Sequence, residues 1–205
     1  DDSIHACGSA SKAWLCKSLR ALSNDIAAKG SHLILRQGDP ASIIPDIITQ
    51  FGIHDVYCNQ YFTPPSLFQE QRLKAALEIA DTNLHLFNGY LLLSPNEIQT
   101  QTGSFYKVFT PFWRRINPEI EASSRLSRSP DSLSSPKGLP ESIDLEQLQL
   151  IPPNNSWAQN MLACWAPGEA GAHQLLDNFI EEHLNGYSAK RDYPWQPATS
   201  RLSPH

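Results

Sequence analysis

The stretch "SHLILRQGDPASIIPDIITQFGIHDVYCNQ", residues 31–60, decides the expected fold class of this chain. Residues 32–38 form a short apolar run that ends in glycine and predicts a buried strand. An Asp-Pro pair then opens a predicted helix over residues 39–51, and a glycine closes it. Residues 54–60 predict the next strand. Because one helix joins the two strands, they are expected to form a parallel βαβ unit with a right-handed crossover.

The same pattern continues on both sides of this unit. Apolar residues at helical spacing predict amphipathic helices over residues 12–29 and 67–80, and "NLHLFNG", residues 83–89, predicts a third strand. The first half is therefore expected to be an α/β domain with a parallel, Rossmann-like sheet. Three strands make a small sheet for a doubly wound domain, so we expect the domain to be incomplete at its start.

A compositional change divides the chain. Residues 121–156 are rich in Ser, Pro and Leu and predict a long linker, which separates a domain over residues 1–120 from a second unit over residues 157–205. In the second unit, residues 167–184 place apolar side chains on one face and predict the most regular helix of the sequence.

Composition narrows the class of protein. The 205 residues are 40% hydrophobic and 9% aromatic, as in a globular protein, and the net charge of -5 argues against coating nucleic acid through bulk positive charge. A local basic groove near Lys190, Arg191 and Arg201 stays possible. The sequence has neither an 18-residue apolar run nor a signal-peptide pattern, and its four cysteines are scattered. We expect a monomeric cytoplasmic protein with free thiols and no membrane contact.

Common catalytic patterns are absent from the sequence. The seven histidines are dispersed, and no HExxH, GxSxG or paired-cysteine arrangement occurs, so we assign no catalytic residue and no metal ligand. His173 and His183 lie nearly three helical turns apart, which is too far to share a metal. The loop after the first predicted strand has one glycine, which does not support a Rossmann dinucleotide site.

The C-terminal stretch "TSRLSPH" is more informative. Thr199, Ser200 and Ser203 supply three hydroxyls, and Ser203-Pro204 resembles the N-cap and first residue of a helix. A helix start with hydroxyls beside it suits a phosphate group. From composition alone, the simpler interpretation is an N-cap whose hydroxyls face solvent.

The run "WAPGEAGAHQLLDNFIEEHLNGYSAKRDYPWQPATSRLSPH", residues 165–205, closely resembles the DNA photolyase/cryptochrome family. The shared motifs are W-x-P-G-E, then Y-x-x-x-R-D-x-P, then T-S-x-L-S-P. Upstream, "TGSFYKVFTPFWRR", residues 102–115, resembles a stretch at the end of that family's N-terminal domain. The resemblance covers the chain from about Trp14 onward. It implies an α/β antenna domain, a long connection and the start of an all-α FAD-binding domain.

The resemblance also implies particular site residues. Tyr187 matches a tyrosine that contacts FAD, and the loop Thr199, Ser200, Arg201, Leu202 and Ser203 matches the one that holds the flavin diphosphate. Arg191 matches a position that contacts DNA in photolyases, with an ion pair to a neighbouring acidic residue as the structural alternative. We interpret Trp165 as a packing residue.

The antenna chromophore is a separate question. Folate-binding members of the family carry an Asn-Glu pair after a strand, and the matching positions, counted from Asn59, are Pro65 and Ser66. The resemblance therefore does not support a folate, and a deazaflavin, another chromophore or none stays open.

The resemblance implies a flavoprotein that repairs cyclobutane pyrimidine dimers in damaged DNA by light-driven electron transfer from reduced FAD to a flipped-out lesion. The alternative is a cryptochrome that uses the same FAD for signalling, and a third is an unrelated α/β nucleotide-binding module. Since most of the family's FAD-binding domain has no counterpart in this sequence, we expect the chain alone to hold no flavin and to repair no DNA.

Overall fold

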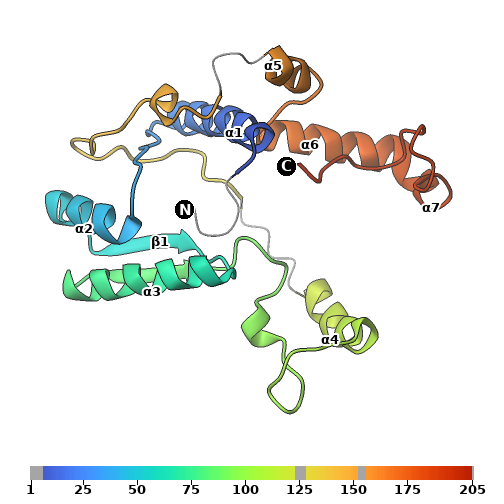
Figure 1. Ribbon diagram of the computed structural model, residues 1–205, viewed down its shortest axis with the longest axis horizontal. Helices are drawn as coiled ribbons and strands as arrows, with labels where there is room; N and C mark the ends of the chain where they lie inside the picture. Colours follow the sequence, from blue (N-terminus) through green and yellow to red (C-terminus); the bar gives the residue numbers. More distant parts are fainter. Residues whose placement is uncertain (1–6, 123–127, 152–155, 205) are drawn as a thin grey trace. The chain divides into compact units, whose positions relative to one another are not determined.

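The computed structural model describes residues 7–122, 128–151 and 156–204. Within them the chain forms two compact units, one made of Asp1–Gln37 with Pro130–His205 and the other of Gly38–Ser129 (Figure 1). The elements, in chain order, are α1 (Ser9–Ala28), α2 (Pro40–Phe51), β1 (Asp55–Asn59), α3 (Pro64–Ile79), β2 (Asn83–Phe87), η1 (Pro95–Glu97), α4 (Phe109–Ala122), η2 (Leu145–Leu148), α5 (Ser156–Ala163), α6 (Glu169–Asn178), η3 (Phe179–His183), η4 (Leu184–Gly186) and α7 (Tyr187–Lys190).

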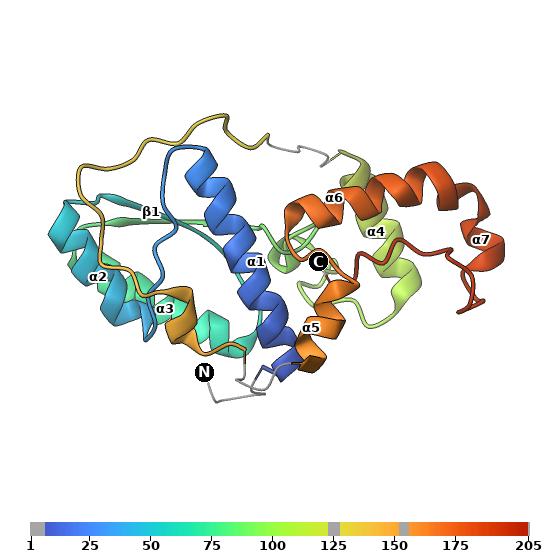
Figure 2. The same cartoon turned by 90° about the horizontal axis from the view of Figure 1, so that it is seen from above.

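The unit Gly38–Ser129, called the second unit below, is built on a parallel pair of strands. β1 and β2 pair in parallel, with Asp55 opposite Asn83 and Asn59 opposite Phe87, and α3 connects them. α2 and α3 lie side by side along one face of this pair (Figure 2). Their contact is an apolar core around Leu77, which is 1% exposed. The predicted α/β class with a parallel sheet is confirmed.

The ends of α2 agree with the sequence. The side chain of Asp39 accepts a hydrogen bond from the backbone N–H of Ala41 at 3.3 Å, as expected of an N-cap. Gly52 ends the helix in the left-handed region at φ 64°, where a side chain would be strained. Local capping therefore fixes both ends of this helix.

The predicted first strand is wrong for the structure as described. Residues 32–37 are extended, but they belong to the other unit and pair with no strand. The backbone N–H of Leu35 donates to Oγ of Ser142 at 2.9 Å, and its carbonyl accepts from the N–H of Ile143 at 3.0 Å. An apolar run becomes a strand only where another strand offers a ladder, and here the connection takes those bonds. The described sheet has two strands, and the βαβ unit is β1-α3-β2.

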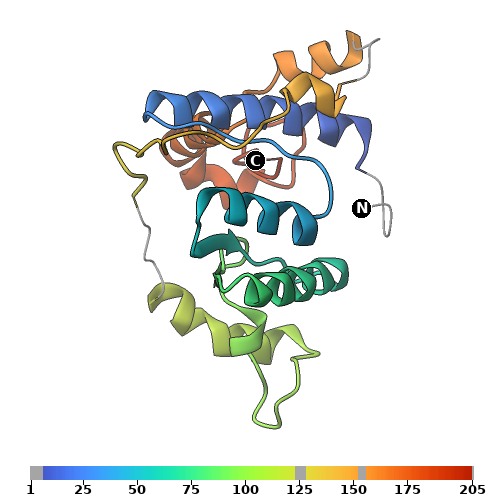
Figure 3. The same ribbon diagram turned by 90° about the vertical axis from the view of Figure 1, so that its left-hand side faces the viewer.

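From residue 130 onward the predicted linker belongs to the first unit and makes specific contacts with α1. The backbone N–H of Leu133 donates to the carbonyl of Lys29 at 2.7 Å, and Arg20 of α1 pairs with Glu146 of η2 at 2.5 Å. Figure 3 shows this connection running along α1. Residues 123–127 and 152–155 of the predicted linker lie outside the described residues. The predicted domain boundaries stay predictions.

The C-terminal helices are less regular than the sequence predicts. The apolar face expected over residues 167–184 starts as α6 but passes into the π-helical turn η3 and then the 3-10 turn η4. The expectation of the most regular helix is therefore wrong, because the side-chain period does not reveal an inserted π turn. None of the helices in the described ranges is long and apolar enough to span a membrane.

Candidate functional site: a hydroxyl loop beside α6

The segment after α7 runs back alongside α6 (Figures 1 and 2). Side chains of both line one pocket. We call residues 199–203 the hydroxyl loop. The pocket has a volume of ≈ 540 Å³. Its lining consists of Leu175, Asn178, Phe179, Glu182, His183, Pro194, Trp195, Gln196, Pro197, Thr199, Ser200 and Arg201. Three residues of the hydroxyl loop therefore face the same concave surface.

The hydroxyls of this loop stay at the surface. Thr199 and Ser203 are exposed, whereas Ser200 is half-buried and its Oγ accepts the backbone N–H of Leu202 at 3.4 Å. Ser203 and Pro204 form a turn, and His205, where the predicted helix would continue, lies outside the described residues. Exposed hydroxyls beside a pocket can donate hydrogen bonds to an anion such as a phosphate.

Arg201 provides a permanent positive charge at this pocket. Its guanidinium lies over the ring of Trp165, with Cζ 4.2 Å from the ring centroid. Trp165 also meets Trp14 of α1 edge to face, with ring centroids 5.8 Å apart. The predicted packing role of Trp165 is therefore confirmed, and the structure adds a cation stacked on its face.

Tyr187 and Arg191 form a second group, on α7 and at its C-cap. The guanidinium of Arg191 lies 5.5 Å from the centroid of the Tyr187 ring, and its Nε lies 3.8 Å from Oδ1 of Asp192. Both partners of that ion pair are more than half exposed, so it is weak. The predicted FAD-contacting and DNA-contacting residues are thus neighbours, although neither lines the pocket of the hydroxyl loop.

Phe179 links the two groups. Its ring meets Tyr187 edge to face at 5.7 Å, and it lines the pocket beside Thr199, Ser200 and Arg201. The sequence analysis placed Phe179 only on the apolar face of a helix. The π turn that starts at Phe179 turns its ring toward both groups, and a helical wheel cannot show that.

Polar residues of the same helix complete the pocket. Asn178, Glu182 and His183 line it, and the sequence analysis gave His183 no functional role. Their spacing along one helix could have indicated a shared face, but only the returning segment shows what they face. Glu182 adds a negative charge, so an anion is expected to bind toward Arg201 and the hydroxyls.

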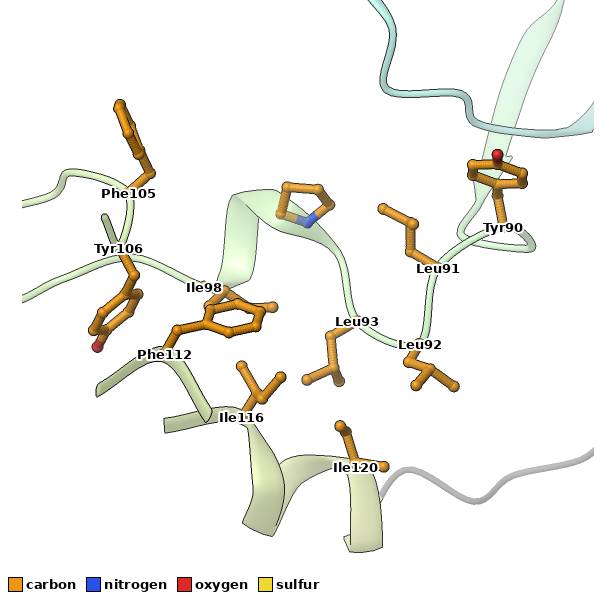
Figure 4. A pocket seen from close by; sticks show the side chains of 11 residues that line it. Tyr90, Leu91, Leu92, Leu93, Ile98, Phe105, Tyr106, Phe112, Ile116 and Ile120 are labelled. Carbon is orange, nitrogen blue, oxygen red and sulfur yellow. The ribbon is translucent and has the colours of Figure 1, made fainter. Parts of the chain in front are cut away.

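The second unit has a pocket of different chemistry. Side chains from the loop after β2 and from α4 surround a volume of ≈ 540 Å³ (Figure 4). The lining is almost entirely aliphatic and aromatic, with Ile116 only 7% exposed and the hydroxyls of Tyr90 and Tyr106 as its polar side-chain groups. The motif at residues 102–115 supplies one wall. Apart from these two phenols the lining has no titratable side chain, so the pocket suits apolar contact.

One face of the strand pair carries polar and aromatic side chains. Asp55 accepts hydrogen bonds from the Asn83 amide at 3.2 Å and meets the His85 ring, with Oδ1 to Nε2 at 2.8 Å. The hydrogen bond from His85, followed by the one from Asn83, lowers the pKa of the Asp55 carboxyl below its ordinary value. The rings of Tyr57 and His85 stack with centroids 4.5 Å apart. Both strands hold this cluster together.

A mixed α/β unit with a small parallel sheet, followed along the chain by helices, defines the class of this chain as an α/β protein with a helical C-terminal segment. Residues 1–131 match the family model described as DNA photolyase. The chain is 38% identical to deoxyribodipyrimidine photo-lyase of Agrobacterium fabrum, over 97% of this chain and 41% of that protein. It is 29% identical to cryptochrome-2 of Arabidopsis thaliana, over 97% of this chain and 33% of that protein.

A solved structure gives the same answer for the fold. The crystal structure of a class III photolyase from Agrobacterium tumefaciens superimposes with a TM-score of 0.88 at 38% identity, covering 99% of this chain and 42% of that one. The chain belongs to the DNA photolyase/cryptochrome family. It spans about two fifths of the photo-lyases it matches.

Proposed function

We propose that this chain is part of a light-dependent DNA-repair flavoprotein that reverses cyclobutane pyrimidine dimers. The observation that carries the proposal is the grouping of Thr199, Ser200 and Arg201 around one pocket, with Tyr187 and Arg191 joined to it through Phe179. The 38% identity to a deoxyribodipyrimidine photo-lyase, over nearly the whole chain, supports the same activity.

The residues present suit the diphosphate of FAD. Thr199, Ser200 and Ser203 offer hydroxyl donors, and Arg201 offers a charge that strengthens hydrogen bonds to phosphate oxygens. Tyr187 is 36% exposed, so part of it is accessible to the cofactor. When bound, reduced FAD supplies the light-driven electron for repair. These residues bind and orient the cofactor and transfer no proton.

Arg191 is the proposed contact to DNA. Its guanidinium is held over Tyr187 and remains more than half exposed, so its N–H groups can reach a phosphate of the strand that carries the lesion. A phosphate contact orients the duplex without reading its sequence. Lys190 precedes it on α7 and provides a matched control of the same charge.

The test uses a chimera, in which this chain is joined to the part of the Agrobacterium photo-lyase that it does not cover. We expect the purified chimera to show flavin absorbance and to restore intact thymines in a dimer-containing oligonucleotide under blue light. Arg191→Ala should weaken binding to that oligonucleotide several-fold and lower its dependence on salt, whereas flavin content stays the same. Lys190→Ala should have a smaller effect. A chimera that is folded by circular dichroism but lacks flavin would overturn the proposal.

The second candidate is a cryptochrome-type photoreceptor. The 29% identity to cryptochrome-2 of Arabidopsis thaliana over 97% of the chain favours it, since Arg191 and the hydroxyl loop do not separate the two activities. In the same assay this candidate predicts bound flavin with no recovery of thymines. Under either proposal the antenna chromophore stays open between a deazaflavin, another chromophore and none, and a bound one would add a second absorbance band to the purified protein.

A further inference from the structure

Arg201 has a closer aromatic partner than any other cation whose ring contact is described in this structure. Its Cζ lies 4.2 Å from the centroid of Trp165, compared with 5.5 Å for Arg191 over Tyr187 and 5.9 Å for Lys107 over Phe105. A guanidinium on an aromatic face is attracted by the negative face of the ring within about 6 Å. The side chain of Arg201 is therefore held against the connection between α5 and α6.

Trp165 is a firm support for this contact. Its ring is half-buried and meets the Trp14 ring at an angle of 70°. The next residue, Ala166, lies against Gly171 of α6, where a Cβ would overlap the Ala166 carbonyl. Because the connection is packed against both α1 and α6, Trp165 cannot move without disturbing two helices.

The backbone of the hydroxyl loop also needs support at Arg201. Its φ is 55°, a left-handed conformation that side chains other than glycine rarely adopt unless the surroundings hold them there. Ala198, just before the loop, is 2% exposed, and Leu202 is half-buried in a groove with Trp14. These two anchors flank Thr199, Ser200 and Arg201 along the chain.

We propose that Arg201 is a positioning residue for the hydroxyl loop. By stacking on Trp165, Arg201 holds the left-handed turn, so that the hydroxyls of Thr199 and Ser200 face the pocket. The guanidinium has five N–H groups, and those directed away from the ring remain able to bind phosphate oxygens. The consequence for ligand binding rests on the proposed function, but the stacking itself does not.

The first test needs no cofactor and uses this chain as it is. Protons of the Arg201 side chain should have NMR signals shifted upfield by the ring current of Trp165, and Trp165→Leu should abolish that shift. The same substitution should move the amide signals of residues 199–203. Trp165→Phe, which keeps a ring, should retain most of both effects. Trp157→Leu, on α5 and 39% exposed, is the matched control and should leave the loop signals in place.

The second test measures flavin affinity in the chimera. Trp165→Leu keeps the charge of Arg201 and removes its platform, so we expect flavin to bind about 3- to 10-fold more weakly. Arg201→Ala should weaken flavin binding at least as much. The double variant should weaken it by less than the product of the two single factors, since both substitutions remove the same contact. Trp165→Phe should restore most of the affinity.

The outcomes separate the two proposals. Absence of the upfield shift, or loop signals unaffected by both Trp165→Leu and Arg201→Ala, overturns the positioning role whatever the flavin result. A flavin affinity that falls with Arg201→Ala but not with Trp165→Leu also overturns it, because Arg201 would then act by charge alone. If the NMR effects occur and a folded chimera holds no flavin, the positioning role stands and the proposed cofactor site fails.

Discussion

At the scale of single residues, a few close contacts hold the backbone conformation of the hydroxyl loop. Arg201 adopts a left-handed backbone and stacks on Trp165, which precedes the tight approach of Ala166 to Gly171. The W-x-P-G-E motif is therefore a support for the loop over thirty residues later in the chain. In this unit a family motif that carries no chemistry of its own still shapes the site.

Replacing Gly171 by Ala tests this support. A Cβ at this position would overlap the backbone carbonyl of Ala166, which cannot rotate away as a side chain could. Although alanine favours a helix by about 1 kcal/mol over glycine, overpacking of this kind costs about 1–3 kcal/mol. We expect Gly171→Ala to lower the free energy of unfolding, measured by urea denaturation.

Gly8→Ala is the matched control, because a Cβ there meets nothing within 4 Å and its φ is -65°. Because Gly8 is the N-cap of α1, where alanine is less favourable than glycine, it should lower the free energy of unfolding by at most about 1 kcal/mol, less than Gly171→Ala does. An unfolding curve of Gly171→Ala that matches the wild type would contradict the close contact.

At the scale of elements, the two faces of the paired strands β1 and β2 carry different kinds of side chain. Val56 and Leu84 face the core beneath α2 and α3, whereas Asp55, Tyr57 and His85 gather on the opposite face. The parallel register brings Asp55 next to Asn83 and within reach of His85. Strand pairing thus creates a polar cluster that neither strand has alone.

The Asp55 carboxyl makes the free energy of unfolding depend on pH. Its pKa in the folded protein lies below the ordinary value of 3.8, mainly because of the hydrogen bond from His85. A lowered pKa stabilises the fold above the ordinary value, and this contribution is lost as pH falls through the folded pKa. The free energy of unfolding of the wild type should therefore exceed that of Asp55→Asn at pH 5, and the difference should shrink below pH 3.8.

NMR titration of the Asp55 carboxyl checks the cause directly. Its midpoint should lie below 3.8 in the wild type and move upward in His85→Ala, since the largest stabilising hydrogen bond is then missing. A midpoint at or above 3.8 in the wild type would show that His85 does not favour the charged carboxylate.

At the scale of the whole molecule, the Ser- and Pro-rich connection joins distant parts of the chain. Leu133 and Ile143 donate backbone hydrogen bonds to residues 29 and 35, and Glu146 pairs with Arg20. The first unit is therefore assembled from the two ends of the sequence, with the α/β unit formed by the part between them.

Ser142→Ala should loosen this connection at one known point. The variant removes the Oγ that accepts the N–H of Leu35, so the Leu35 amide should exchange with deuterium about 2- to 10-fold faster. Ser132→Ala, at an exposed position of the same connection, should leave the exchange rate of Leu35 unchanged. Equal rates of Leu35 exchange in wild type and Ser142→Ala would show that this bond does not form in solution.

The sequence by itself determined the helices around residues 9–28, 40–51 and 64–79, both observed strands and the family, because caps, apolar periodicity and ordered motifs act locally along the chain. Tertiary structure decided what periodicity cannot encode. Residues 32–37 form no strand, because Ser142 and Ile143 hydrogen-bond to Leu35. Tertiary structure also placed Arg201 on Trp165, since a contact across that span depends on the path by which the chain returns along α6.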